Sequence, residues 1–283
     1  MNRLQMIKKI EGLRDLPTLS TVAMEVNRML KDVETPIEQL LALLEKDQAM
    51  ALKILRLVNS SFYGFKSKIS SLRHAVTLMG YNTVQNAVVV VSVIDSLSIS
   101  GQLKEFDIAD FWTHSIRVAV MSRHLASLSK LSGPEDAFTA GLIHDIGKVV
   151  LVNHFPDVFV TVMESAAADG IAFFDAEKKH GTYPHNLIGN VLAGKWMLPE
   201  SLASAVRFHH NDTVRDIEAL TGLVTVADTL VNLMDGMKGH RLQPETIPTV
   251  VRAPINKILK DSSRWYASVK REMATACEFF IKR

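Results

Sequence analysis

Histidine and aspartate residues placed inside apolar runs constrain this chain more than any other feature. Seven such residues occur, in the order His114, His144, Asp145, His185, His209, His210 and Asp228. An imidazole or a carboxylate that is buried without a partner costs much free energy. The fold must therefore provide partners for these side chains, and a shared cation is the simplest partner for all of them.

Composition places the chain among ordinary globular proteins. It has 283 residues, of which 47% are hydrophobic and 22% are charged, and this balance gives no indication of disorder. The 32 basic and 30 acidic residues are dispersed along the chain and leave a net charge of +2. Because no basic stripe of the kind that follows a phosphate backbone is visible, no nucleic-acid partner is expected.

Neither a membrane span nor a secretion signal is predicted. The longest apolar run, residues 87–94, is far shorter than the roughly 20 residues that cross a bilayer, and the start of the chain lacks an apolar signal core. The one cysteine, Cys277, cannot form an intrachain disulfide and is interpreted as a small hydrophobe on a terminal helix. We therefore expect a cytoplasmic protein with no membrane partner.

Apolar residues at helical spacing predict an all-α fold. Ile37, Leu40, Leu41 and Leu44 share one face behind the helix-start signal of residues 35–38. The valine-rich run 87–94 suits a strand or a buried helix, and its helical surroundings favour the helix. Further helices are predicted at residues 111–128, 134–152, 159–168, 184–196, 199–210 and 217–233. Pro134, Pro184 and Pro199 are expected in the first turns of three of them.

A polar segment at residues 98–102 divides the chain into two parts. The part before it holds none of the seven candidates, and the part after it holds all of them. We therefore predict a boundary near residue 100, with an N-terminal helical subdomain at residues 1–100 and a metal-binding helical subdomain at residues 101–283.

The strongest local signal is the pair His144-Asp145, which interrupts the apolar run at residues 140–148. Adjacent residues of a helix point about 100° apart, so both reach one ion only if it lies over the ridge between them. Together with His114 and Asp228 they give a four-ligand skeleton of nitrogen and oxygen donors, which suits iron, manganese, nickel or zinc. Asp110, one turn before His114, is a candidate additional ligand or an orienting carboxylate.

Three more imidazoles extend the apolar faces of predicted helices. His185 lies in a first turn, and His209 and His210 end another helix, so they would coordinate a second metal or bind phosphate as cations. The alternative for any single histidine is an ordinary polar side chain with a protein partner. For Asp228 the alternative is a buried salt bridge to Arg117, Arg123 or Lys148.

The arrangement of His114, His144-Asp145 and Asp228 resembles that of the HD superfamily of metal-dependent phosphohydrolases. The resemblance is closer to one branch, the HD-related output domain or HDOD, and covers nearly the whole chain. The similar segments are residues 16–19, 22–23, 47–55, 58–64, 69–72, 75–80, 111–115, 144–148 and 227–228. This resemblance implies an all-α, multi-helix bundle like that of HD domains, with an N-terminal helical subdomain.

The related HD-GYP phosphodiesterases, which cleave cyclic diguanylate, use further ligands. His185, His209 and His210 resemble those ligands, and Asp110 matches an acidic one. The Gly-Tyr-Pro signature that follows the double histidine in that family is absent from residues 211–215. The sequence therefore lacks the mark of cyclic-dinucleotide cleavage.

The HDOD resemblance leaves two functional interpretations. The first is a bacterial signalling or regulatory module that retains one or two divalent metals, presents its N-terminal subdomain to a signalling protein and binds a phosphate-containing ligand. The second is an active phosphohydrolase, cleaving phosphomonoesters or phosphodiesters. In it the metals would lower the pKa of a water, Asp145 or a base behind the ligands would take the proton, and Lys148 would stabilise phosphate charge.

Overall fold

A computed structural model of the chain describes residues 3–13, 16–29, 36–60, 63, 65, 67–97, 103–210 and 217–281. Every regular element in these ranges is a helix, and one isolated antiparallel bridge joins Leu103 to Phe106. The predicted all-α fold is therefore confirmed. Thr35 of the helix-start signal, the boundary segment 98–102 and residues 211–215 lie outside the described residues.

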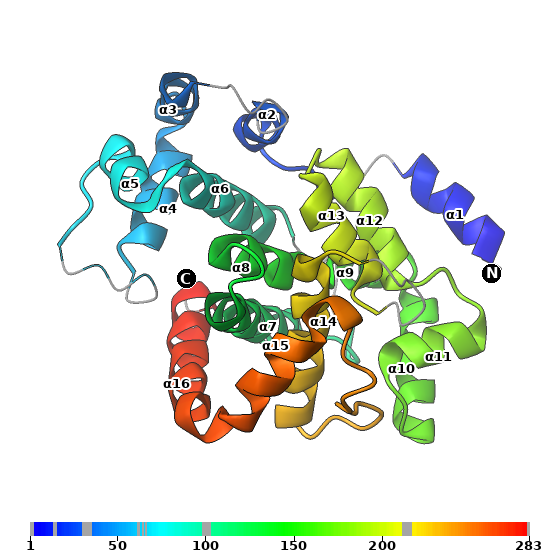
Figure 1. The fold of residues 1–283 in the computed structure, drawn as a ribbon. Helices are drawn as coiled ribbons and strands as arrows, with labels where there is room; N and C mark the ends of the chain where they lie inside the picture. Colours follow the sequence, from blue (N-terminus) through cyan, green and yellow to red (C-terminus); the bar gives the residue numbers. More distant parts are fainter. Residues whose placement is uncertain are drawn as a thin grey trace.

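Within the described residues, the N-terminal part of the chain forms six helices, called the front helices below (Figure 1). They are α1 (Arg3–Gly12), α2 (Thr21–Met29), α3 (Ile37–Glu45), α4 (Gln48–Val58), α5 (Leu72–Met79) and α6 (Tyr81–Ser96). The valine-rich run lies in α6, so its assignment to a helix is confirmed. Residues 84–93 of α6 are all buried, because α2, α4, α5 and α8 pack around it. Burial on several sides outweighs the weak preference of valine for strands.

Ten helices follow. They are α7 (Ile108–Ser129), α8 (Pro134–Ile143), α9 (Ile146–His154), α10 (Pro156–Asp169), α11 (Phe173–His180), α12 (His185–Lys195), α13 (Glu200–Phe208), α14 (Ala219–Met234), α15 (Thr249–Lys260) and α16 (Ser262–Ile281). Helix α7 lies at the centre and packs against α8, α14, α15 and α16. No single described helix is long and apolar enough to cross a bilayer, and only the bent pair 134–154 and 156–169, which turns by 120°, has the required length and composition together.

The predicted single helix at residues 134–152 is interrupted in the structure. Helix α8 ends at Ile143 and α9 begins at Ile146, so His144 and Asp145 form the connection between them. Asp145 has φ −100° and ψ 8°, values that leave the helical region. The side chains of His144 and Asp145 therefore do not have to point 100° apart, as successive side chains of a regular helix do.

Two of the three prolines lie one position earlier than predicted. Pro134 is the first residue of α8, in agreement with the sequence analysis. Pro184 and Pro199 are instead the N-caps of α12 and α13, with ψ of 152° and 145°. The prolines still mark the starts of these helices, because each backbone is extended just before the first turn.

The start of the chain packs against its second half (Figure 1). The ammonium of Lys9 in α1 lies 4.8 Å from the centre of the Phe155 ring. The indole of Trp196 donates a hydrogen bond to the Pro17 carbonyl at 2.8 Å, and Asn27 in α2 donates to the Trp196 carbonyl at 2.9 Å. Trp196, only 1% exposed, therefore joins Pro17 and α2 to the end of α12.

Candidate metal centre

All seven predicted residues meet around the break between α8 and α9. Helix α7 supplies His114, the break supplies His144 and Asp145, α12 supplies His185, the end of α13 supplies His209 and His210, and α14 supplies Asp228. They form two groups, within each of which the donor atoms lie within 4.8 Å of one another. The spatial convergence predicted from the sequence is present.

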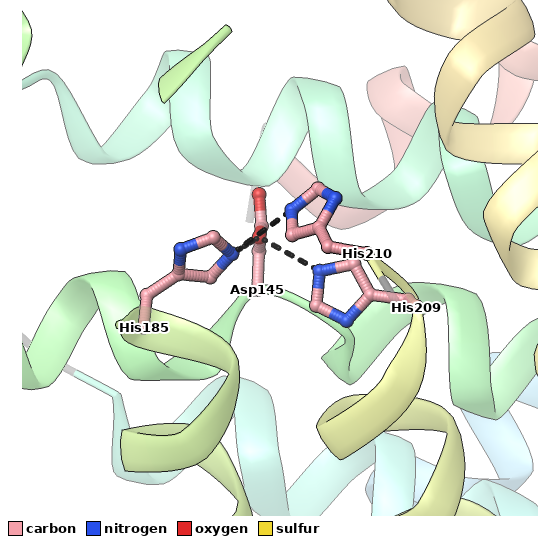
Figure 2. A group of neighbouring side chains, drawn as sticks. All are labelled: Asp145, His185, His209 and His210. Atoms are coloured by element: carbon pink, nitrogen blue, oxygen red, sulfur yellow. Dashed lines mark hydrogen bonds and ion pairs between the residues drawn. The ribbon is translucent and has the colours of Figure 1, made fainter. Parts of the chain in front are cut away.

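The first group contains Asp145, His185, His209 and His210 (Figure 2). The Asp145 Oδ1 atom lies 3.0 Å from His185 Nε2 and 3.6 Å from His209 Nε2. The Nε2 atoms of His185 and His210 are 3.2 Å apart. Three imidazoles and one carboxylate thus direct donor atoms toward a common point.

The second group contains His114, His144 and Asp228. The Asp228 Oδ1 atom lies 3.2 Å from His114 Nε2 and 3.7 Å from His144 Nε2. The second oxygen of Asp145, Oδ2, is 3.4 Å from His144 Nε2 and 3.8 Å from His114 Nε2. Asp145 therefore faces both groups, with one carboxylate oxygen toward each.

Three buried atoms at the centre have no hydrogen-bond partner among the described residues. They are the Nε2 atoms of His144 and His209 and the Oδ1 atom of Asp145. The other ring nitrogens of these histidines contact backbone carbonyls, at 2.7 Å from Gly141 and 2.8 Å from Val206. A proton on Nδ1 satisfies those contacts and leaves the Nε2 lone pairs facing Asp145. Divalent cations fit this arrangement, because one cation in each group of donor atoms would satisfy these three atoms.

Neighbouring charges set the protonation of the cluster. Burial opposes ionisation of Asp145, but Lys148 and His144 hold its pKa well below the usual range. Burial likewise opposes ionisation of Asp228, but hydrogen bonds from histidines hold its pKa low. Burial opposes protonation of His144, but the carboxylates of Asp145 and Asp228 raise its pKa to about 10, so a cation would have to displace the proton on Nε2. Burial lowers the pKa of His209 to about 4.

Lys148, which the sequence predicts to stabilise phosphate charge, contacts Asp145 at the centre, and its role toward phosphate stays a prediction. Its ammonium lies 2.5 Å from Asp145 Oδ2 and 5.2 Å from the centre of the Phe173 ring. Among the ion pairs of the described residues, none joins Asp228 to Arg117, Arg123 or Lys148, which were the alternative partners. Asp228 instead contacts the two histidines and accepts a hydrogen bond from Asn232 at 2.7 Å.

The basic residues considered for that salt bridge have other partners. Arg117 pairs with Asp235, and Arg123 pairs with Glu135 and Glu272. Asp110, the candidate additional ligand, lies in the first turn of α7 with an exposed side chain. It is not a member of either group of donor atoms.

Two glycines of the segment 140–148 allow the helices to approach. A Cβ atom at Gly147 would lie 1.9 Å from the carbonyl oxygen of His185, and one at Gly141 would lie 2.8 Å from the Cα atom of Ala119. Helix α9 therefore lies directly against the start of α12, and α8 against α7. These contacts bring Asp145 to His185 and His144 to the helix that bears His114.

The sequence analysis missed the contribution of α11. Glu177 is buried, and its carboxylate accepts hydrogen bonds from the backbone and the ring of His185. Phe174 stacks on His210 with ring centres 4.6 Å apart. The charged sequence of residues 175–180 is typical of an exposed helix, and the only signal for Glu177 is its place one turn after Phe173 and Phe174.

A cavity of about 440 Å³ opens beside the centre. Three of the donor residues line it, which are His209, His210 and Asp228. The lining also includes the basic side chains of Lys178, His240, Arg241 and Arg252 and the acidic side chains of Asp175 and Glu245. Arg252 is held by the backbone carbonyls of Glu245 and Ile247, whereas Arg241 is exposed. The cavity therefore gives a small molecule access to three of the seven donor residues.

Comparison with known proteins indicates both a family and a fold. A sequence model of the HDOD domain matches residues 16–212. An uncharacterized protein of Treponema pallidum (strain Nichols) is 24% identical over 260 residues, which are 90% of this chain and 49% of the relative. The chain therefore spans about half the length of that curated relative.

Two solved structures share the fold. An HDOD domain protein of unknown function from Geobacter sulfurreducens superposes with a TM-score of 0.77 at 24% identity, over 98% of each chain. A protein of Shewanella amazonensis, provisionally described as a phosphohydrolase, has a TM-score of 0.73 at 24% identity, over 97% of this chain and 96% of its own. At this level of identity the likeness shows the fold alone.

Proposed function

This chain belongs to the HDOD domain family, and we propose that it is a metal-dependent phosphohydrolase that acts on a phosphate ester. The observation that carries this proposal is the convergence of seven ligand-type side chains, three of which line a cavity that also holds Lys178, Arg241 and Arg252. A complete set of nitrogen and oxygen donors suits hydrolysis with a divalent metal. The three basic side chains would pair with the phosphate of the substrate.

The two groups of donor atoms would hold one cation each. Asp145, His185, His209 and His210 would bind the first, and His114, His144 and Asp228 the second. Cations at such sites supply a water of lowered pKa and neutralise phosphate charge. Manganese, iron, nickel and zinc all suit this donor set.

Two basic residues would act on the candidate ligands and on the substrate, which are Lys148 and Arg241. The Lys148 ammonium keeps Asp145 ionised and holds its Oδ2 atom, and it places a positive charge where phosphate oxygens would gather. Because the pKa of Asp145 is low, this carboxylate is a weak base, and we assign it the role of ligand. Arg241, exposed at the cavity, would attract the anionic substrate.

The test is hydrolysis by protein of known metal content. Protein stripped of metal is reloaded separately with Mn²⁺, Fe²⁺, Ni²⁺ or Zn²⁺ and offered phosphomonoesters and phosphodiesters. We expect turnover with at least one metal, and loss of both turnover and bound metal in Asp228→Asn, which preserves shape. The surface substitution Asp261→Asn is the control. Metal-loaded protein that hydrolyses no substrate class would contradict the proposal.

A second candidate is a bacterial signalling module. It is favoured by the front helices, because α2 to α6 supply none of the seven residues yet expose Leu52 (63%) and Leu78 (49%). In this role the metal centre binds a phosphate-containing ligand, and a signalling protein contacts the front helices. Stoichiometric metal and measurable binding of inorganic phosphate, without turnover on any ester, would favour this candidate.

A further inference from the structure

Helix α11 contacts the candidate ligand His185 through its backbone N–H and its Nδ1 atom, and not through the Nε2 atom that faces the centre. The Oε1 atom of Glu177 accepts a hydrogen bond from the backbone N–H of His185 at 2.8 Å. Its Oε2 atom lies 2.7 Å from the Nδ1 atom of the same residue. Both side chains are fully buried. One carboxylate therefore fixes both the start of α12 and the ring that it carries.

This contact determines which ring nitrogen faces the centre. With a proton on Nδ1 donated to Glu177, the lone pair of His185 is on Nε2. That atom lies 3.0 Å from Asp145 Oδ1 and 3.2 Å from His210 Nε2, inside the first group of donor atoms. A carboxylate behind a ligating histidine also makes the ring a stronger donor.

The surroundings of Glu177 favour this role over a general structural one. A buried carboxylate is costly, yet both of the hydrogen bonds that it accepts within the described part of the chain come from His185. Phe173 and Phe174, on the same helix, place their rings 5.7 and 6.2 Å from the His185 ring. Helix α11 thus encloses His185 on the side away from Asp145.

We propose that Glu177 is a positioning residue that prepares His185 to bind metal through Nε2. The inference rests on the metal centre of the proposed function and deepens it, because it assigns a role to a residue outside the seven ligands. It requires no hydrolytic activity, so a metal-binding regulatory protein would use Glu177 in the same way.

Glu177→Gln separates positioning from folding. The glutamine oxygen can still accept the backbone N–H of His185, but its NH₂ group then faces Nδ1 and moves the ring proton to Nε2. We expect the affinity for Mn²⁺ and Zn²⁺, measured by competition with a chromophoric chelator, to fall about 10- to 100-fold. The melting temperature should change little. Glu164→Gln, an exposed position of α10, is the matched control and should retain full affinity.

A double-mutant cycle tests whether Glu177 acts through His185. In a His185→Ala background, Glu177→Gln should cause no further loss of affinity. Wild-type affinity in Glu177→Gln, or an equal loss in both backgrounds, would overturn the inference alone. Wild-type protein that binds none of the metals would overturn it together with the proposed function.

A conservative variant covers the case in which Glu177→Gln does not fold. Glu177→Asp keeps the carboxylate on a shorter side chain, so the proton remains on Nδ1. We expect its affinity for Mn²⁺ and Zn²⁺ to lie between that of the wild type and that of the His185→Ala variant. An affinity as low as that of His185→Ala would show that charge and tautomer are irrelevant, and would overturn the inference.

Discussion

Gly147 is a residue at which even one methyl group should disturb the centre. A Cβ atom there would meet two backbone atoms of α12, His185 O at 1.9 Å and Gly189 N at 2.7 Å, and neither can move without moving the helix. We expect Gly147→Ala to lower the free energy of unfolding by about 3 kcal/mol, the upper range for overpacking. Urea denaturation measures this change.

A second glycine provides the control for that substitution. At Gly194, near the end of α12, an added Cβ atom would meet nothing within 4 Å. Gly194→Ala should therefore be neutral or raise the free energy of unfolding by up to about 1 kcal/mol. Equal effects at both positions would contradict the close approach of α9 and α12.

At the residue scale, the sequence predicts the candidate ligands better than the residues that support them. The seven donors are visible because each is a polar group in an apolar run, which implies a buried partner. Glu177 belongs to a charged stretch and contacts His185 from a different helix, so no spacing reveals it. Asp110 fits the spacing of its helix, but its side chain is exposed, because periodicity does not fix which face is buried.

At the element scale, Asn59 closes the segment between α4 and α5. Its side chain donates to the carbonyl of Ile69 at 2.8 Å and accepts from the N–H of Ile69 at 2.7 Å. We expect Asn59→Ala to lower the free energy of unfolding by about 2 kcal/mol, because two backbone groups lose their partner. Asn82→Ala, at an exposed site in α6, should change it by less than about 0.5 kcal/mol. Comparable losses in chemical denaturation would refute this role of Asn59.

The break between α8 and α9 is an element that local sequence does not reveal. Residues 134–152 carry a continuous apolar pattern, which predicts one helix. The interruption at His144 and Asp145 coincides with close backbone contacts on both sides, of Gly141 with α7 and of Gly147 with α12. Tertiary contacts thus decide the local conformation, and they do so at the two residues that bear donor atoms.

At the scale of the whole molecule, the centre connects helices that are distant in sequence. Its donors come from α7, α12, α13, α14 and the α8–α9 break, so a bound cation would hold these helices together. At a metal concentration of roughly 100 times Kd, the free energy of unfolding should rise by about 2.7 kcal/mol. Urea titrations with and without Mn²⁺ or Zn²⁺ measure this rise. Asp228→Asn should show a much smaller one, and an equal rise would place the metal elsewhere.

Alkaline pH should weaken the fold through Tyr63. Its hydroxyl donates to Glu135 at 3.2 Å, and burial raises its pKa well above the ordinary value of 10.0. The folded state therefore keeps this proton after the unfolded state has lost it. The contribution of Tyr63 to the free energy of unfolding is complete below about pH 10. Above that pH it declines by up to about 1.4 kcal/mol per pH unit. Urea midpoints between about pH 9 and 11 should fall less steeply in Tyr63→Phe, and parallel slopes would exclude this cause.

The sequence predicts the class of the whole fold but not the attachment of its first helix. Helical periodicity and punctuation give the all-α architecture, because these signals are local, and the helical surroundings of residues 87–94 favour a helix there. The contacts of Lys9 with Phe155 and of Pro17 with Trp196 are long-range, and no local pattern encodes them. The boundary near residue 100 lies outside the described residues and stays a prediction.

Trp196 has a practical consequence for anyone who dissects this protein. Its indole and its carbonyl both form hydrogen bonds with residues among the first thirty of the chain. The two predicted subdomains, residues 1–100 and 101–283, therefore depend on each other for these contacts. A fragment consisting of residues 101–283 would leave the indole N–H and the carbonyl of Trp196 without their hydrogen-bond partners, at an apolar surface that is newly exposed to water. Chimaeras that exchange residues 1–100 between relatives should therefore preserve the contacts of Pro17 and Asn27 with Trp196.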